Sequence, residues 1–377
     1  MMNKEISLYS RYNNITLLFK FILTILLTNR YSQIIALWVL KGSLRLRVSF
    51  IARLLNGVYF GGETLSQAEK IVTELAKNKI FSVLDYAVEG LENELFFEEA
   101  TSSTLNLIEL AVSNKNIPYV VIKPSSLGAT EVYEHISKNI TPSPVYEVQW
   151  QKILLRYDRI FHFAEKNNIK IMIDAEQSWV NPAVMFIAQE GMQIYNKNKA
   201  IVTITLQCYK KDALNILERI KLDCVEKDYV AGIKIVRGAY LEEEKKAGER
   251  SLDVFFTSKE ETDRNYNLAI DYILYNIDYF LPFFATHNSD SLEKIMDATR
   301  SYNENFWVGQ LYGIADTLSL KAVNSGIKVC KYLPYGPFDK SLPYLLRRIE
   351  ENAVAIETFR QENFSIKKEL MKRIKGH

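Results

Sequence analysis

Two adjacent arginines near the end of the sequence could bind an anionic ligand. Arg347 and Arg348 lie in the segment YLPYGPFDKSLPYLLRRIEEN, residues 332–352, whose pattern predicts a helix after a strand. Residues three, four and seven apart share a helix face, so Tyr344, both arginines and Glu351 should point the same way. A guanidinium donates two parallel hydrogen bonds, which suits a carboxylate or a phosphate. The alternative is a solvated surface helix in which Arg347 pairs with Glu351.

Eight short apolar runs alternate with longer amphipathic stretches, and the last run ends at the start of the arginine segment. They cover residues 81–85, 119–123, 170–174, 201–208, 230–237, 282–286, 306–311 and 328–332. Apolar strands separated by helices are typical of a parallel sheet that is covered on both faces. Eight such units predict an α/β fold, a (β/α)8 barrel of the TIM type.

The stretches between the runs indicate the helices. After the break Thr141-Pro-Ser-Pro, apolar residues recur at helical spacing over residues 146–164 and predict one buried stripe. Shorter helices are predicted at 212–220 and 289–296. The run EEEKK, residues 242–246, predicts a solvated helical turn without a chemical role.

The domain organisation follows from the lack of any linker or low-complexity tract within the barrel pattern. We expect one catalytic barrel over residues 65–352, an N-terminal helical segment over 1–64, and a helical tail over 353–377 that frays at its basic end. A second catalytic domain does not fit in 377 residues, so a monofunctional chain is expected.

Charge is unevenly distributed along the chain. The net charge of +2 argues against nucleic-acid binding, yet residues 1–60 hold eight Lys or Arg and one Glu, a net of +7 that leaves −5 for the rest. Two apolar segments, 15–28 and 31–40, are shorter than the roughly 20 residues of a membrane span, and the first of them contains Lys20. We expect helices packed on the main domain of a cytoplasmic protein, with peripheral contact to the inner face of the membrane as the alternative.

Cysteine and histidine spacing excludes several classes of site. Cys208, Cys224 and Cys330 form no CxxC pair, which fits a reducing compartment and a structural role. The four histidines are scattered, so no metal site is predicted. The G-x-S-x-G, GxGxxG and GxxxxGK[ST] motifs are absent, which argues against serine hydrolase, Rossmann and P-loop proteins.

Polar residues gather at the predicted strand ends, where the active site of such a barrel lies. They are Asp85, Lys123, Asp174, Gln207, Lys234, Arg237, Thr286, His287, Asn288 and Tyr332. Gln207 and Lys234 interrupt apolar strands, so each is expected to be buried and must then find a polar partner. Simpler roles remain for some of the others. Asp85 or Asp174 could cap the helix that follows its strand. Lys123 could point into solvent, and His287 could bond to a local backbone group. As a set they suit a phosphate-bearing cofactor and an anionic substrate.

Seven motifs, in order, identify a family resemblance. VVIKPSS, IMIDAE, TLQCYKKD, IKIVRGAYLEEE, FFATHNSDS, QLYGIAD and YLPYGPFDKSLPYLLRRIEENA lie between about Tyr59 and Asn352. Together they resemble proline dehydrogenase. The resemblance implies a distorted (β/α)8 barrel that binds FAD and oxidises L-proline to 1-pyrroline-5-carboxylate by hydride transfer from ring C5 to flavin N5. It also implies that electrons pass to a quinone, as the first step of proline degradation to glutamate.

The resemblance assigns substrate roles to matching residues. Arg347 and Arg348 bind the proline carboxylate and Glu351 orients them. The remaining substrate residues are Lys123, Asp174, Leu311, Tyr332 and Tyr344, of which the last three form an apolar box around the ring. Tyr332 favours proline, because hydroxyproline-oxidising relatives have a smaller residue there.

The resemblance also assigns cofactor roles. Gln207 and Lys234 contact the flavin ring, the latter near N5, where bifunctional relatives often carry arginine. The rest of FAD is assigned to Arg237, Gly238, Ala239, Tyr240, Thr286, His287 and Asn288. Product would pass to a separate pyrroline-5-carboxylate dehydrogenase.

Four alternatives remain open at this stage. Two are other FAD-barrel oxidoreductases, namely methylenetetrahydrofolate reductase and hydroxyproline dehydrogenase. A third is a barrel that forms a Schiff base on Lys123 or Lys234. The fourth is a non-catalytic, membrane-associated scaffold.

Overall fold

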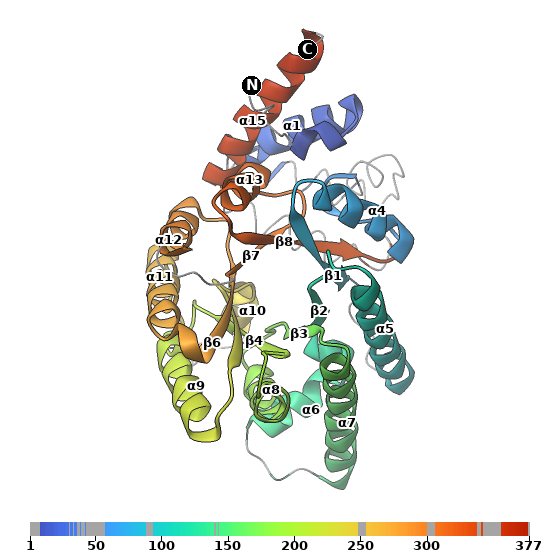
Figure 1. The fold of residues 1–377 in the computed structure, drawn as a ribbon, viewed down its shortest axis with the longest axis vertical. Coiled ribbons are helices and arrows are strands. Elements are labelled where there is room, and N and C mark those ends of the chain that lie inside the picture. Colours follow the sequence, from blue (N-terminus) through green and yellow to red (C-terminus); the bar gives the residue numbers. More distant parts are fainter. Residues whose placement is uncertain are drawn as a thin grey trace. The chain divides into compact units, whose positions relative to one another are not determined.

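The eight predicted runs are the eight strands of a closed parallel barrel, in which β1 to β8 follow one another in chain order (Figure 1). The structure is a computed structural model that describes residues 8–29, 31–32, 34–35, 38, 42, 57–87, 93–138, 141, 143–247, 254–299, 306–337, 341 and 356–375. The strands are β1 Ile80–Tyr86, β2 Tyr119–Ile122, β3 Lys170–Ile173, β4 Val202–Gln207, β5 Ala231–Val236, β6 Phe280–Ala285, β7 Trp307–Leu311 and β8 Lys328–Tyr335. The predicted α/β barrel is confirmed.

The chain divides into two compact units, of which one spans residues 90–285. In it, β2 to β6 pair in parallel, each with the next. Its helices are α5 Glu94–Ser113, α6 Thr130–Ser137, α7 Pro144–Lys166, α8 Asn181–Tyr195, α9 Ala213–Lys227, α10 Leu241–Lys246 and α11 Lys259–Tyr275.

The longest of these helices, α7, shows how sequence sets the local structure. Ser143 caps it by accepting a hydrogen bond from the backbone of Tyr146, and Pro144 occupies the first turn, where no backbone donor is needed. The predicted apolar stripe is buried along Trp150, Ile153, Tyr157, Ile160, Phe161 and Ala164. Each large side chain buried in this way contributes about 1.5–3 kcal/mol to stability.

The other unit comprises residues 1–89 and 286–377. In it β8 pairs in parallel with both β1 and β7. The helices described in it include the 3-10 turn η1 Leu8–Arg11, α1 Asn14–Leu27, α4 Leu65–Ala76, α12 Ser289–Thr299, α13 Asp316–Asn324 and α15 Ile356–Ile374.

The two terminal helices, α1 and α15, lie side by side (Figure 1). Tyr9, Tyr12, Leu17 and Ile366 form a buried apolar cluster there. Arg373 donates hydrogen bonds to the backbone carbonyls of Tyr9 and Tyr12 at 3.0 and 2.9 Å. The prediction of a tail that frays at its basic end was therefore wrong, because α15 is anchored through its last turn.

The opposite side of α1 is apolar and open to solvent. Ile15, Leu18, Ile22 and Ile25 are 65%, 50%, 49% and 44% exposed. Across the described ranges, no helix has the length and hydropathy needed to cross a membrane.

All three cysteines are buried free thiols. Burial raises the pKa of the Cys208 thiol to about 12 and that of Cys224 to about 11. Because the thiolate is the reactive form, these side chains are chemically inert at neutral pH, as the predicted structural role requires.

Candidate active site

The ends of β3 and β5 carry an ion pair. Lys234 in β5 lies with its ammonium 2.6 Å from Oδ1 of Asp174, and their side chains are 6% and 16% exposed. Asp174 directly follows β3, and its backbone donates to the carbonyl of Ile122 on β2. This confirms that the lysine inside an apolar strand is buried and has a polar partner. It also places charge at the strand ends, where barrel enzymes bind their substrates.

Gln207, the last residue of β4, links the loops that follow β3 and β5. Its Nε2 donates to the carbonyl of Glu176 at 2.8 Å, and its Oε1 accepts from the backbone of Ala239 at 3.4 Å. Both polar atoms of the carboxamide are thus hydrogen-bonded. This confirms that Gln207, like Lys234, has polar partners although it lies in an apolar strand.

Arg237, directly after β5, is held by α11. Its Nε donates to Asp263, and the guanidinium lies 4.4 Å from the centroid of the Tyr266 ring. Burial opposes ionisation of Asp263, but the hydrogen bonds from Lys259 and Arg237 outweigh it and lower the pKa of this carboxyl. Arg237 therefore keeps an ionised partner and a fixed position.

The turn after Arg237 requires glycine. Gly238 has φ +124°, and a Cβ atom there would lie 1.6 Å from the ring of Tyr209. Any side chain would both strain the backbone and collide with the ring. The turn continues through Ala239 and Tyr240 into α10.

Two buried glutamates that the sequence analysis did not single out brace these loops. Glu176 accepts from the backbone and the hydroxyl of Ser125 at 2.9 and 2.6 Å. Glu244 of α10 has no exposed area and accepts from the backbone and the hydroxyl of Ser178, both at 2.6 Å. The prediction that residues 242–246 form a solvated turn was therefore wrong for Glu244. No local signal marks which of the three consecutive glutamates is buried.

In the other unit, Thr286, His287 and Asn288 join β6 to α12. The backbone of Thr286 donates to the carbonyl of Gly309 on β7, and Nε2 of His287 accepts from the backbone of Leu311 at 2.8 Å. The simpler role for His287, a bond to a backbone group, is thus observed. Asn288 caps α12, because its Oδ1 accepts from the backbone of Ser291 at 2.9 Å.

Two residues of the predicted apolar box are neighbours on adjacent strands. Leu311 ends β7, and its register partner in β8 is Tyr332. Tyr332 was predicted at a strand end, but β8 continues to Tyr335. The strand continues through Pro334, since proline is tolerated where no ladder hydrogen bond needs its nitrogen.

The remaining predicted residues have the following positions. Lys123 follows β2 and is half-buried. Asp85 lies inside β1, and Asp174 follows β3, so neither caps a helix: Asn93 caps α5, and Val180 precedes α8. Tyr344, Arg347, Arg348 and Glu351 lie outside the described residues.

An eight-stranded parallel barrel with charged side chains at the C-terminal ends of its strands is the architecture of an enzyme. The fold is similar to that of proline utilization A from Bdellovibrio bacteriovorus inactivated by N-propargylglycine. The TM-score is 0.71 at 20% identity, over 90% of this chain and 37% of that one.

The sequence comparisons define the family. The family model for proline dehydrogenase matches residues 68–361. The chain is 44% identical over 378 residues to the carbapenem antibiotics biosynthesis protein CarD of Pectobacterium carotovorum subsp. carotovorum, covering 100% of both chains. It is 28% identical to mitochondrial proline dehydrogenase 1 of Dictyostelium discoideum, covering 84% of this chain and 64% of that relative. The chain belongs to the proline dehydrogenase family.

Proposed function

We propose that this chain oxidises L-proline to 1-pyrroline-5-carboxylate with FAD as its cofactor. The observation that carries the proposal is the family match over residues 68–361, which spans all eight strands of the barrel. The charged strand ends support it, because proline is a zwitterion whose carboxylate and ring nitrogen both need polar partners.

In this proposal the substrate is held by its carboxylate. Arg347 and Arg348 bind it and Glu351 orients them. Leu311, Tyr332 and Tyr344 contact the apolar ring, and the register pairing of the first two supports a shared role. Lys123 and Asp174 complete the substrate set. Fixing the carboxylate aims the C5–H bond, which is what transfer at near-attack distance requires.

The residues assigned to FAD suit such a group. Lys234 and Arg237 supply positive charge, Gln207 presents an amide that is already held in place, and the turn at Gly238 has no room for a side chain. Ala239 and Tyr240 follow in that turn, and Thr286, His287 and Asn288 supply polar groups before α12. FAD, when bound, supplies the hydride acceptor. We propose solvent as the acceptor of the substrate nitrogen's proton, because none of the assigned residues that the structure describes is an evident base.

Purified protein is expected to be yellow and to bleach when L-proline is added without oxygen. Bleaching should be slower with hydroxyproline, because Tyr332 fills the space beside the ring. Absorbance near the flavin maximum, followed in an anaerobic cuvette, measures both. If the protein is colourless and borohydride traps the substrate on it covalently, a lysine Schiff base is supported and the proposal is wrong.

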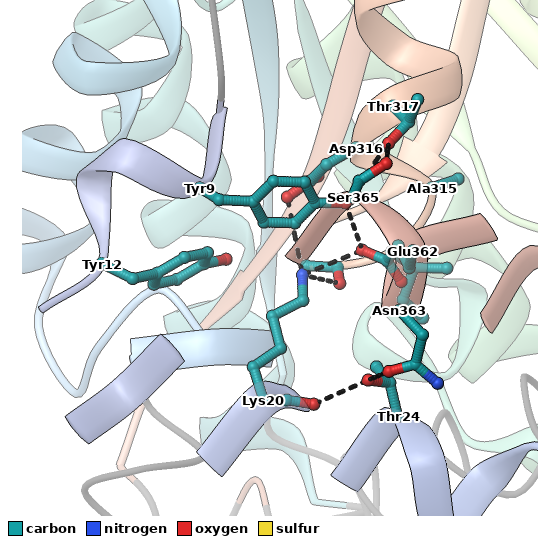
Figure 2. Close-up of polar contacts among 12 residues, drawn as sticks. Tyr9, Tyr12, Lys20, Thr24, Ala315, Asp316, Thr317, Glu362, Asn363 and Ser365 are labelled. Atoms are coloured by element: carbon teal, nitrogen blue, oxygen red, sulfur yellow. Dashed lines mark hydrogen bonds and ion pairs between the residues drawn. The ribbon is translucent and has the colours of Figure 1, made fainter. Parts of the chain in front are cut away.

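We further propose that a membrane quinone accepts the electrons and that α1 touches the lipid surface. Its exposed apolar side chains are Ile15, Leu18, Ile22 and Ile25. Arg11 and Lys20 are used in buried ion pairs, and Figure 2 shows those of Lys20. The other six basic residues in 1–60 lie outside the described residues. The proposed contact therefore rests on the apolar side of α1.

The triple variant Ile15→Ser/Leu18→Ser/Ile22→Ser is expected to lose co-sedimentation with phosphatidylglycerol vesicles. Its activity with a soluble dye acceptor should be unchanged, because none of the three side chains is buried. Point variants are preferable to deleting residues 1–56, since α1 also supplies Lys20 to the protein interior. Equal vesicle binding by the variant and the parent would contradict membrane contact through α1.

The product could serve either proline degradation to glutamate, with a separate pyrroline-5-carboxylate dehydrogenase, or a biosynthetic pathway. The 44% identical relative named for carbapenem biosynthesis favours the second use. Isotope-labelled L-proline, followed in the cell of origin into glutamate or into a β-lactam, distinguishes the two.

A further inference from the structure

Two buried glutamates join loops at the C-terminal ends of the strands in the unit of residues 90–285. Glu176 lies in the loop between β3 and α8, and Glu244 lies in α10, which follows β5. They are 8% and 0% exposed. Glu176 binds Ser125 in the loop after β2, and Glu244 binds Ser178 in the loop after β3. We call these two contacts the serine clamps.

Both serine clamps have the same hydrogen-bond pattern. One carboxylate oxygen of Glu176 accepts from the backbone N–H of Ser125 at 2.9 Å, and the other accepts from its hydroxyl at 2.6 Å. Glu244 binds the backbone N–H and the hydroxyl of Ser178 in the same way, both at 2.6 Å. A carboxylate offers two acceptor oxygens, whereas a carboxamide offers one. The pattern therefore explains why both positions carry glutamate, and it fixes the backbone of each serine as well as its side chain.

The first clamp holds the turn that follows Lys123. Ser125 lies in the 3-10 turn η2 Pro124–Ser126, and the proline at its start keeps the backbone of Lys123 extended, at φ −96° and ψ 125°. The carbonyl of Lys123 accepts from the backbone and the hydroxyl of Ser126 at 2.9 and 2.6 Å. The turn is thus closed by its own hydrogen bonds. Because Glu176 binds this turn, it also sets the position of Lys123.

Glu176 is itself held at its backbone. Its N–H donates to Oδ1 of Asn181 at 3.2 Å, and its carbonyl accepts from Nδ2 of the same side chain at 3.0 Å. The same carbonyl accepts from Nε2 of Gln207 at 2.8 Å. Asp174 lies two residues earlier in this loop. Glu176 therefore connects the turn after Lys123 to the loop of a second assigned substrate residue and to a residue assigned to the flavin ring.

The second clamp holds the turn assigned to the cofactor. Glu244 lies one helical turn after Tyr240, and its backbone N–H donates to the carbonyl of Tyr240 at 2.9 Å. Tyr240 ends the turn that begins at Gly238. Through Ser178, Glu244 ties this turn to the loop that contains Glu176. The two clamps thus form one connection from the loop after β2, through the loop after β3, to the turn after β5.

We propose that the serine clamps position two parts of the site separately: Glu176 fixes Lys123 for the substrate, and Glu244 fixes the turn at Gly238 for FAD. This inference rests on the proposed function. Both glutamates are positioning residues, because each acts through a neighbouring group that is assigned to the substrate or to the cofactor. The alternative is that the clamps only stabilise the loops, and the two roles predict different changes in kinetics and in flavin content.

Glu176→Ala removes the carboxylate and leaves the backbone contact with Gln207. With rates normalised to bound flavin, KM for L-proline should rise at least about tenfold and kcat should change by less than about threefold, because a binding residue loses its position. Cyclopentanecarboxylate has the ring and the carboxylate without the nitrogen, so it binds without being oxidised. Its Kd, measured from the change in flavin absorbance, should rise by a similar factor. The flavin-to-protein ratio after gel filtration should be unchanged.

Glu244→Ala is expected to have the opposite effect. Its flavin-to-protein ratio should fall at least about threefold, whereas KM of the flavin-loaded fraction should stay within about threefold of the parent value. The matched control is Glu190→Ala, which removes an exposed glutamate of α8 and should leave both quantities within about twofold of the parent values. Equal changes in the two clamp variants, or no change in either, would overturn the proposal.

A double-mutant cycle with Lys123→Met tests the route from Glu176 to the substrate. If Glu176 acts through Lys123, Glu176→Ala should add less than about twofold to KM once residue 123 is methionine. Multiplicative effects would show that the route is wrong, and so would a parent-like KM in Lys123→Met alone. Failure of the parent protein to oxidise L-proline would instead reject the proposed function and is seen before any variant is made.

Two serine variants cover the case in which a glutamate variant does not fold. Ser125→Ala and Ser178→Ala each remove one hydroxyl and keep the hydrogen bond from the serine backbone. Loss of one such bond should raise KM about threefold in the first and lower the flavin-to-protein ratio about twofold in the second. Folded serine variants with parent values of both quantities would show that the clamps serve stability alone.

Discussion

Replacing Arg348 with methionine is expected to lower kcat/KM for L-proline by about 100- to 1000-fold. A guanidinium that binds a carboxylate through two charge-assisted hydrogen bonds leaves a desolvated charge unpaired when it is removed, which costs about 2–5 kcal/mol. Most of the loss should fall on KM, because the carboxylate is bound both before and during the reaction. Arg347→Met should behave alike, and steady-state kinetics with a dye acceptor measures both.

The matched control is Arg219→Met, which removes an exposed guanidinium from α9. It should leave both kinetic constants within about twofold of the parent values, as surface substitutions usually do. Parent-like oxidation of L-proline by both arginine variants would show that the pair does not bind the carboxylate and would favour the alternative of a solvated helix.

Lys234→Met is expected to lower kcat by about 100-fold and to weaken flavin retention. The substitution leaves the Asp174 carboxylate without the ammonium 2.6 Å away, and breaking one side of a buried pair typically costs about 3–5 kcal/mol. It also removes a positive charge assigned to the flavin ring, where charge tunes the cofactor. The measurements are the flavin-to-protein absorbance ratio after gel filtration and the rate of anaerobic bleaching.

Two further variants sharpen this prediction. Lys234→Arg keeps the charge and should retain most of the bound flavin. Lys259→Met is the control, because Lys259 also pairs with an aspartate, Asp263. The Lys259 side chain is 51% exposed, so activity should stay within about twofold of the parent value. If Lys234→Met bleached at the parent rate with full flavin content, the assigned role of Lys234 would be wrong.

The barrel could be predicted because its strands are local features. Each run of apolar residues is long enough to read alone, and each proved to be one strand. The polar residues at the strand ends followed, since parallel strands present the same end to one edge. Gln207 and Lys234 were recognisable because an apolar strand rarely contains a polar side chain without a partner.

The burial of Lys20 and Glu244 could not be predicted, because it depends on partners far away in the chain. Lys20 interrupts an apolar run, and the sequence analysis used it only as an argument against a membrane span. Its hydrogen-bond partner Gly313 lies 293 residues further on. The burial of Glu244 could not be recognised either, because the run that contains it is charged throughout and nothing in the sequence around Ser178 indicates the contact.

The pairing of α1 with α15 has a consequence for the biogenesis of the protein. Lys20 is synthesised long before Glu362, its ion-pair partner at 2.9 Å. Until α15 leaves the ribosome, docking α1 would bury an ammonium without its full set of counter-charges, which is costly. The contact between α1 and α15 can therefore form only after α15 has been synthesised.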